Sequence, residues 1–378
     1  MIERTKLRIT TITPVTIGSG VELSPYADYF IDGNMICFLD KKKVHDKIIQ
    51  KGNQYLDLYV QGVATGMEMN GNNRSEFDLR SFLLNNKIVQ SMDEVVSSKC
   101  NATIFSNQKL PIKGIIKSPL AEPYFPGSSV KGALKTILMY NWLKTNKDAD
   151  RMIEEVVKGK EIEKNREKKW IAGNFDFLEK KFECFVNDKN ELVRSNTIQQ
   201  VTDSKMMPKD SNFVVDCYRA GIPLRFECIA KEQTSEFELT LDNYKWEDLA
   251  EQANKYAEDV LEREFALIES DKKMTLYYNF LADIEEKILE TGDGIAYIRI
   301  GFGKGYYLNS LGIAIYDYVT QKGNENLYDK FEKFINNQFA KTNKYGSKQE
   351  IDLDDFPKTR LFVTTTKEPL GWIKVEKM

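Results

Sequence analysis

Hydrophobic and polar positions alternate over the first hundred residues in the manner of a sheet-forming region. Residues 6–17 (KLRITTITPVTI) place β-branched side chains between polar ones, which predicts a strand. Two apolar runs surround Asp32-Gly33-Asn34, and an Asp-Gly step accommodates positive φ, so residues 29–40 predict a hairpin. Further strands are predicted over 102–105 and 110–118, and helices over 41–51 and about 75–90.

From residue 126 the apolar positions recur every three or four residues, which predicts a helix. They share one helix face: Leu134, Ile137, Leu138 and Trp142. Ser128 or Ser129 would supply the N-cap. The charged stretch 145–170 predicts a helical or mobile insertion. Later segments predict strands over 213–221, 222–231, 236–242, 296–300, 359–365 and 371–377, and helices over 246–270, 274–291 and 326–339.

Strands therefore dominate the ends of each half of the chain, with helices connecting them. This order favours an α+β fold over a parallel doubly wound sheet. We place a domain boundary near residue 232, where a cluster of strands gives way to helices. The division gives an N-terminal domain, 1–232, with a helical insertion at about 140–200, and a C-terminal domain, 233–378.

Composition narrows the class of protein. The chain has 378 residues, 42% hydrophobic and 29% charged, as in soluble globular proteins of two domains. Its net charge of −3 counts against a free-standing nucleic-acid binder but not against a local basic patch. Widely spaced cysteines and the lack of a long apolar run predict a cytoplasmic protein with no membrane segment. His45 is the only histidine, which excludes a two-histidine metal site and disfavours a histidine-based triad. We expect no cofactor and no bound metal.

Three glycine-containing turns carry the candidate chemistry. The first, IGSG at 17–20, has the hydroxyls of Thr16 and Ser19 beside glycines that let a ligand approach the backbone. An ordinary turn at the end of a strand is the alternative interpretation.

The second turn, FPGSSVKGALKT at 125–136, leads into a helix start. Free backbone N–H groups there would accompany Ser128, Ser129, Lys131 and Lys135, which are the components of a phosphate site. A Walker A loop is excluded, because Ala133 stands where that motif needs lysine. A capped helix with solvated lysines is the alternative.

The third turn, IRIGFGKGYY at 298–307, combines glycines, cations and aromatic rings. It contains Arg299, Gly301, Phe302, Gly303, Lys304 and Gly305. Cations that contact phosphates and rings that stack on bases are typical of sequence-tolerant single-strand binding. Alternate glycines also occur in bulged strands, which is the competing explanation.

Asp28 and Asp32 in SPYADYFIDG are the candidate carboxylates for a metal or for activation of a 2′-hydroxyl. Aspartates beside a hairpin turn are also common turn formers.

The ordered set of motifs resembles the RAMP superfamily of CRISPR-associated proteins, and within it the family of the fifth Csm subunit. The likeness runs from end to end through TPVTIGSG, SPYADYFID, YFPGSSVKGALKT, VTDS, DCYRAGIPLRFE, IRIGFGKG, FPKTRLFV and PLGWIKVE. It implies tandem ferredoxin-like (RRM-type) modules with helical insertions. It also implies a subunit of the type III-A (Csm) complex that binds single-stranded CRISPR RNA, caps the backbone filament at the crRNA 3′ end and supports crRNA maturation in antiviral defence.

Carried over by position, the resemblance assigns RNA contacts to the second turn and makes 301–305 the family's glycine-rich loop. Phe302 occupies a position that is often tryptophan in relatives. Asp28 falls near the sequence position at which related backbone subunits have the aspartate that cuts target RNA. The implied partners are CRISPR RNA, the backbone filament subunit and other Csm subunits, with host nucleases as helpers. We expect a non-catalytic subunit. There are two alternatives. One is a RAMP ribonuclease that uses Asp28, with Asp32 and Asp203 as the next candidates, and the other is the subunit that holds the guide's 5′ end.

Overall fold

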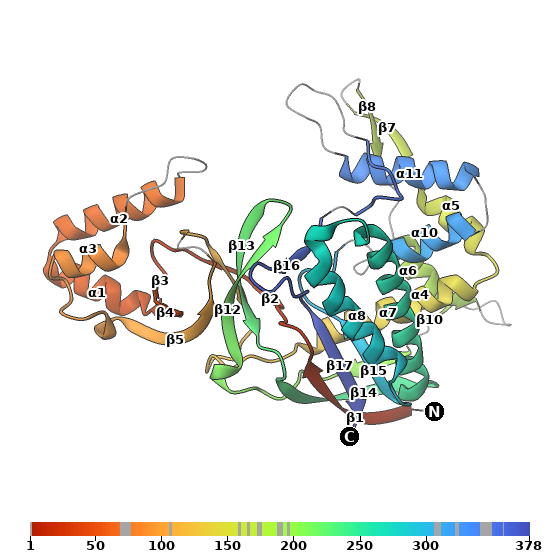
Figure 1. The fold of residues 1–378 in the computed structure, drawn as a ribbon, viewed down its shortest axis with the longest axis horizontal. Helices are drawn as coiled ribbons and strands as arrows, with labels where there is room; N and C mark the ends of the chain where they lie inside the picture. The colour runs from red at the N-terminus through yellow and green to blue at the C-terminus, as the bar shows by residue number, and fades with distance from the viewer. Residues whose placement is uncertain are drawn as a thin grey trace.

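The computed structural model describes most of the chain and confirms a mixed α+β architecture (Figure 1). The described residues are 2–68, 77–105, 108–157, 160–164, 167–171, 176–186, 192–194, 197–305, 311–321, 325–340, 350–357 and 359–378. No helix within these ranges has the length and apolarity needed to cross a bilayer.

The first of two large sheets has five strands with both chain ends at its centre. Its order is β11 (Ile198–Val201), β14 (Thr234–Asp242), β1 (Ile2–Thr11), β17 (Trp372–Lys377) and β15 (Ile295–Arg299). Thr5, Leu7, Ile9 and Thr11 of β1 are buried while residues between them face outward, as the alternating sequence predicts. β1 pairs antiparallel with both β14 and β17.

The second sheet has eight strands. Along its main path these are β2 (Gly18–Leu23), β6 (Ile112–Ile115), β13 (Ile222–Ile229), β12 (Asn212–Arg219), β5 (Val96–Thr103), β4 (Met35–Leu39) and β3 (Tyr29–Asp32), and β16 (Leu361–Val363) also pairs with β12. β1 ends at Thr11 and β2 begins at Gly18, so residues 12–17 connect the two sheets.

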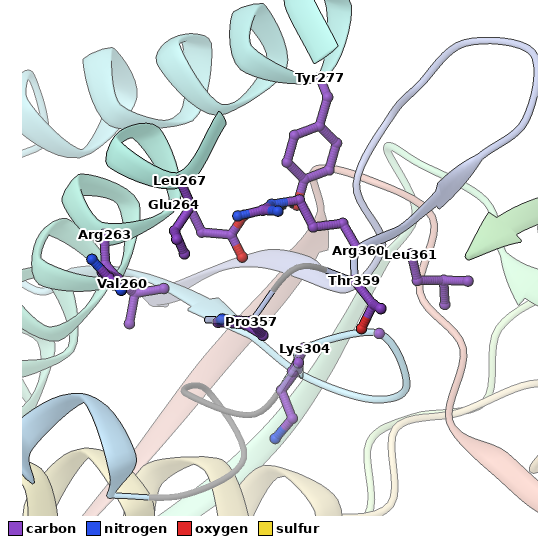
Figure 2. Close-up of a pocket in the computed structure, with 12 residues that line it drawn as sticks. Val260, Arg263, Glu264, Leu267, Tyr277, Lys304, Pro357, Thr359, Arg360 and Leu361 are labelled. Atoms are coloured by element: carbon purple, nitrogen blue, oxygen red, sulfur yellow. Dashed lines mark hydrogen bonds and ion pairs between the residues drawn. The ribbon is translucent and has the colours of Figure 1, made fainter. Parts of the chain in front are cut away.

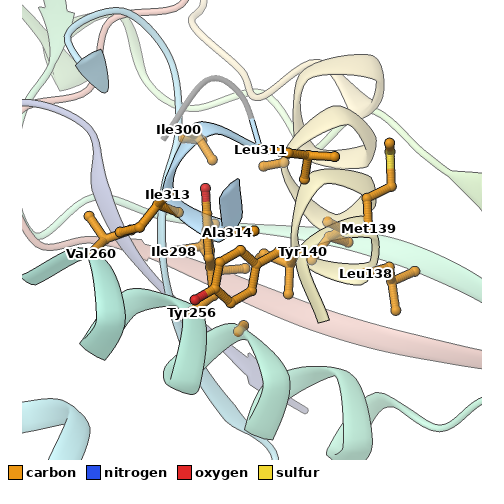
Figure 3. Close-up of a cluster of buried hydrophobic side chains, with 14 of the residues drawn as sticks. Leu138, Met139, Tyr140, Tyr256, Val260, Ile298, Ile300, Leu311, Ile313 and Ala314 are labelled. Carbon is orange, nitrogen blue, oxygen red and sulfur yellow. The ribbon is translucent and has the colours of Figure 1, made fainter. Parts of the chain in front are cut away.

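Helices from both halves of the chain cover the five-stranded sheet. α4 (Gly127–Thr145) and α7 (Trp246–Ile268) contact its strands, and α8 (Thr275–Leu289) packs on α7. Outside them, α10 (Gly312–Gln321) packs on α4, and α11 (Glu325–Phe339) packs on α10 and α5 (Ala149–Val157). Figure 3 shows where α4, α7 and the end of β15 meet: Tyr140 and Leu138 come from α4, Tyr256 and Val260 from α7, and Ile298 from β15. Fully buried side chains at this junction fix the end of β15 relative to both helices.

Three helices near the N-terminus form a separate lobe, at the left of Figure 1. They are α1 (Lys41–Lys51), α2 (Asn53–Glu68) and α3 (Leu79–Asn85). The lobe has its own hydrophobic cluster, built on Val44, Ile48 and Leu83, which packs on the hairpin of β3 and β4. The elements between α4 and β11 are α5 (Ala149–Val157), β7 (Lys160–Lys164), β8 (Glu167–Ile171), α6 (Asp176–Glu183), β9 (Cys184–Val186) and β10 (Leu192–Arg194).

Most predicted elements are confirmed. The hairpin over 29–40 forms with Gly33 at φ +58°, and the helices over 41–51, 246–270 and 274–291 correspond to α1, α7 and α8. The first strand is shorter than predicted and ends at Thr11. The charged insertion is helical only in α5, because β7 and β8 pair as strands. Neither α2 nor α10 was predicted.

The prediction that Ser128 or Ser129 caps α4 is wrong. The helix begins at Gly127 with Pro126 at the N-cap, and no side chain at that position caps it. The five-stranded sheet takes β1 and β11 from before residue 232 and its other strands from after it. The division into two ferredoxin-like modules near residue 232 stays a prediction.

Candidate nucleic-acid interface

The glycine-rich loop at 301–305 lies directly against the connection between β1 and β2. The Phe302 N–H donates to the Thr16 carbonyl at 2.8 Å. Gly301 has φ +75°, and a Cβ there would lie 2.2 Å from the same carbonyl oxygen. Glycine is therefore required twice at this position, for its backbone angle and for the close approach. The first and third predicted turns are side by side.

Arg299 supports this loop from inside the protein. Its side chain is only 5% exposed. Its Nε donates to the Leu370 carbonyl at 2.8 Å, and one terminal nitrogen donates to the Gly303 carbonyl at 3.1 Å. The guanidinium also lies over the ring of Trp372, 5.9 Å from its centroid. The prediction that Arg299 meets phosphates does not fit this burial, because the guanidinium holds the loop's own backbone.

An open groove of about 680 Å³ borders the outer side of the loop. Gly18, from the first turn, and Phe302 line it together. Arg219 at the end of β12, Leu361 at the start of β16 and Phe339 at the end of α11 complete its walls. The groove thus joins five segments that are far apart in the sequence.

Lys304 points away from this groove and lines two small cavities beneath the loop. One, of about 10 Å³, also contacts Ala133 and Thr136 of α4, so the second and third predicted segments share a cavity. The other, of about 20 Å³, is lined by Lys304 and Arg360 (Figure 2). Each has room for little more than a water molecule. Burial lowers the pKa of the Lys304 ammonium, and the nearby charge of Arg299 lowers that pKa further.

The start of α4 is held by another part of the chain. The Gly127 N–H donates to Asp203 Oδ1 at 2.7 Å, and a Cβ on Gly127 would lie 2.3 Å from the Val201 carbonyl oxygen. A carboxylate therefore already occupies the end of the helix dipole, where a phosphate was predicted to bind. The hydroxyl-bearing Ser128 is exposed and Ser129 is half-buried.

The two lysines of this segment contact protein groups. Lys131 Nζ donates to the Gln199 carbonyl of β11 at 3.3 Å, and Lys135 forms an ion pair with Glu179 of α6. Both contacts are partly exposed, so RNA could replace them at modest cost. RNA binding by Ser128, Ser129, Lys131 and Lys135 stays a proposal.

Ser19 lies in the exposed strand β2. Its hydroxyl donates to the Gly114 carbonyl at 3.1 Å and accepts the Val21 N–H at 3.3 Å. These bonds hold the bulge that the first turn makes against β6. The serine therefore shapes the turn next to the groove.

Asp28 has the geometry of a turn former. It is 7% exposed, its Oδ2 accepts the Ser24 N–H at 2.7 Å, and its Oδ1 lies 2.7 Å from Lys41 Nζ. Asp32 lies 3.1 Å from an Arg80 guanidinium nitrogen. Within the described ranges, no group of three or more His, Cys, Asp or Glu side chains could hold a metal ion. Both oxygens of Asp28 are engaged, which favours the structural interpretation of this residue.

The residues that complete the groove, Arg219, Phe339, Thr359 and Leu361, were not singled out as site residues from the sequence. Arg219 did lie within the motif DCYRAGIPLRFE, but as one arginine next to a turn it carried no signal of its own. Its place in the groove depends on the pairing of β12 with β16, a contact between strands more than a hundred residues apart.

Comparison with known proteins identifies the family. The RAMP superfamily model matches residues 8–307. The chain belongs to the RAMP superfamily. It is similar to the CRISPR system Cms protein Csm5 of Methanocaldococcus jannaschii, with 26% identity over 98% of this chain and 88% of the relative. It is also similar to Csm5 of Streptococcus thermophilus, with 26% identity over 38% of this chain and 40% of the relative.

Two solved structures share the fold. One is a chain of a cryo-EM structure of a Csm–crRNA–target RNA ternary complex from a type III-A CRISPR-Cas system, with a TM-score of 0.65, 20% identity and coverage of 98% of this chain and 100% of that chain. The other is the crystal structure of T. onnurineus Csm5, with a TM-score of 0.60, 18% identity and coverage of 97% and 99%. The resemblance inferred from the motifs, to the RAMP superfamily and to Csm5, is confirmed.

Proposed function

We propose that this RAMP protein binds single-stranded CRISPR RNA as the Csm5-type subunit of a type III-A complex. In this proposal it caps the backbone filament at the crRNA 3′ end and supports maturation of the crRNA. The observation that carries the proposal is the seating of loop 301–305 on the turn after β1, beside an open groove lined by an aromatic ring and an arginine.

The chemistry of this interface suits a strand held without reading of its sequence. Gly18 leaves its backbone open to a sugar–phosphate chain, while Gly301 and Gly303 let the loop lie close to Thr16 and Leu361 and so shape the groove. Contacts of this kind position RNA but carry no base information. A guide-binding subunit needs that property, because the spacer sequence differs from one guide to the next.

The near-neutral net charge agrees with a subunit of an assembly. A net charge of −3 gives little general attraction for RNA, so binding would depend on the local site and on neighbouring subunits. The backbone filament subunit is the neighbour expected next to a terminal cap.

A cross-linking map tests this proposal. The full chain is co-expressed with the other Csm subunits and a guide, and photo-cross-links are mapped to nucleotide positions. We expect cross-links near the 3′ end, and complexes lacking this chain should carry guides with altered 3′ ends. Cross-links confined to the 5′ end would instead assign it to the opposite terminus.

The ribonuclease alternative has its own test. Purified protein is incubated with labelled RNA and Mg²⁺, with Asp28→Asn as the comparison. Because the Asp28 carboxylate already accepts an N–H and pairs with a lysine, we expect no cleavage that depends on this residue. Cleavage by the wild type that is lost in Asp28→Asn would overturn the non-catalytic assignment.

A further inference from the structure

The groove is lined by a positively charged side chain, Arg219, that lies outside the three glycine-containing turns. Arg219 is exposed at the end of β12, and its backbone is fixed on both sides, opposite Ile222 of β13 and Leu361 of β16. Among the described residues, its guanidinium has no hydrogen-bond or ion-pair partner. A charged group on a rigid sheet, unpaired and directed into a groove, is arranged for a ligand of opposite charge.

Phe302 is held in place from below. Its backbone N–H is bonded to the Thr16 carbonyl, and its ring lies 5.2 Å from the ring of buried Phe226. The side chain nevertheless stays 42% exposed and lines the same groove as Arg219. An aromatic surface fixed in this way stacks on a planar partner with little loss of conformational entropy.

We propose that the groove takes one nucleotide of a single RNA strand, with its base stacked on Phe302 and a flanking phosphate paired with Arg219. This inference rests on the proposed RNA-binding function and deepens it by naming the residues that hold the strand. It also changes the roles predicted from the sequence, because the phosphate contact belongs to Arg219 and not to Arg299 or Lys304, which lie beneath the loop.

The lining of the groove supports a nucleotide whose base is not read. Its volume of about 680 Å³ lies within the usual range for small-ligand sites, about 300–1,000 Å³. Ile17, Phe302, Phe339 and Leu361 make most of the described walls apolar, so they supply stacking and van der Waals contact without pairing to base edges. Arg219 then supplies the main electrostatic attraction.

Two variants measured against two ligands separate the two contacts. The ligands are an oligouridine and an abasic ribose-phosphate strand of equal length, and affinity is measured by fluorescence anisotropy at several salt concentrations. The variants of the full chain are Phe302→Leu and Arg219→Gln. Phe302→Tyr keeps a stacking ring, and Arg151→Gln changes an exposed arginine on α5, outside the groove.

Phe302→Leu should weaken binding of oligouridine by about 5- to 150-fold, the range for loss of one base–aromatic stack, and leave abasic binding unchanged. Arg219→Gln should weaken both ligands by the same factor and reduce the salt slope by roughly 0.7–1, as for one phosphate contact. Phe302→Tyr should keep the preference for oligouridine over the abasic strand that Phe302→Leu loses, and Arg151→Gln should bind both ligands like the wild type.

Equal losses of affinity for both ligands in Phe302→Leu would show that the ring only supports the loop. An unchanged salt slope in Arg219→Gln would show that Arg219 makes no phosphate contact. Either result overturns this inference, but the proposed function stands as long as the wild-type chain binds RNA. A wild-type chain that binds no RNA, alone or assembled with other Csm subunits, would overturn both.

Discussion

Gly301→Ala is the change that most directly tests how the glycine-rich loop is held. The new methyl group would meet the Thr16 carbonyl oxygen at 2.2 Å, and the alanine would have to adopt φ +75°. Gly305 offers a matched control, since it has φ +79° but a Cβ added there would meet no atom of the described residues within 4 Å. The two variants share the backbone cost and differ in the collision.

The magnitudes follow from these two features. A left-handed backbone angle costs a non-glycine residue roughly 1–2 kcal/mol. Relief of the collision requires Thr16 to move, which breaks its bond with the Phe302 N–H and removes about 0.5–1.5 kcal/mol. The effect of alanine on the unfolded chain is common to both variants and cancels in their comparison. We expect Gly305→Ala to lose about 1–2 kcal/mol of stability and Gly301→Ala about 1.5–3.5 kcal/mol.

Urea unfolding of both variants measures this difference, and hydrogen exchange at the Phe302 amide reports whether the contact with Thr16 has opened. Gly301→Ala should also bind single-stranded RNA less tightly than Gly305→Ala, because the groove depends on the seated loop. Equal unfolding free energies, together with equal protection of the Phe302 amide, would refute the argument that this contact builds the groove.

Three further outcomes are expected. Asp203→Ala should lower the unfolding free energy by about 0.5–2 kcal/mol, the usual value of a helix cap, while Asp203→Asn should lose less; urea unfolding compares the two. Glu179→Gln should remove the ion pair of Lys135 with α6 and strengthen RNA retention by a few-fold at low salt, and Glu251→Gln, which removes an exposed ion pair on α7, should have no effect. Weaker RNA retention by Glu179→Gln would contradict a phosphate contact by Lys135. The hydrogen bond from Lys47 and two backbone N–H donors lower the pKa of Glu94 to about 2 from its ordinary 4.5, so its stabilising effect is complete above about pH 4.5 and is lost as the pH falls toward 2. The Tm of Glu94→Gln, measured by thermal unfolding, should therefore lie below that of the wild type at pH 7 and approach it in acid. A difference in Tm that does not depend on pH would count against this linkage.

Local features of the chain determined much of the fold. Alternation of apolar residues predicted β12, β13 and β14, and the Asp-Gly step predicted the hairpin of β3 and β4. The three glycine segments were also recognised, and the fold brings them together: the first turn packs against the third, and α4 shares a cavity with the third. The sequence was sufficient to predict these features because periodicity, turn chemistry and glycine requirements act over a few residues.

The roles of individual cations were decided by the tertiary structure alone. Arg299, Lys304 and Arg219 are all basic residues close to glycines in the sequence. Folding buries Arg299, turns Lys304 beneath the loop and leaves Arg219 in the groove. A side chain's direction depends on which strand or helix packs beside it, and those neighbours come from distant parts of the chain.

The same reason explains the start of α4. The sequence determined that a helix begins near residue 127 and that glycine, serine and lysine surround its first turn. Only the fold brings Asp203, from a segment 76 residues away, to the free N–H of Gly127. The sequence thus determined which polar and charged groups the chain has. Long-range packing decided which of them are already paired within the protein and which remain open to a ligand, because burial and pairing depend on the folded surroundings and not on the local chain.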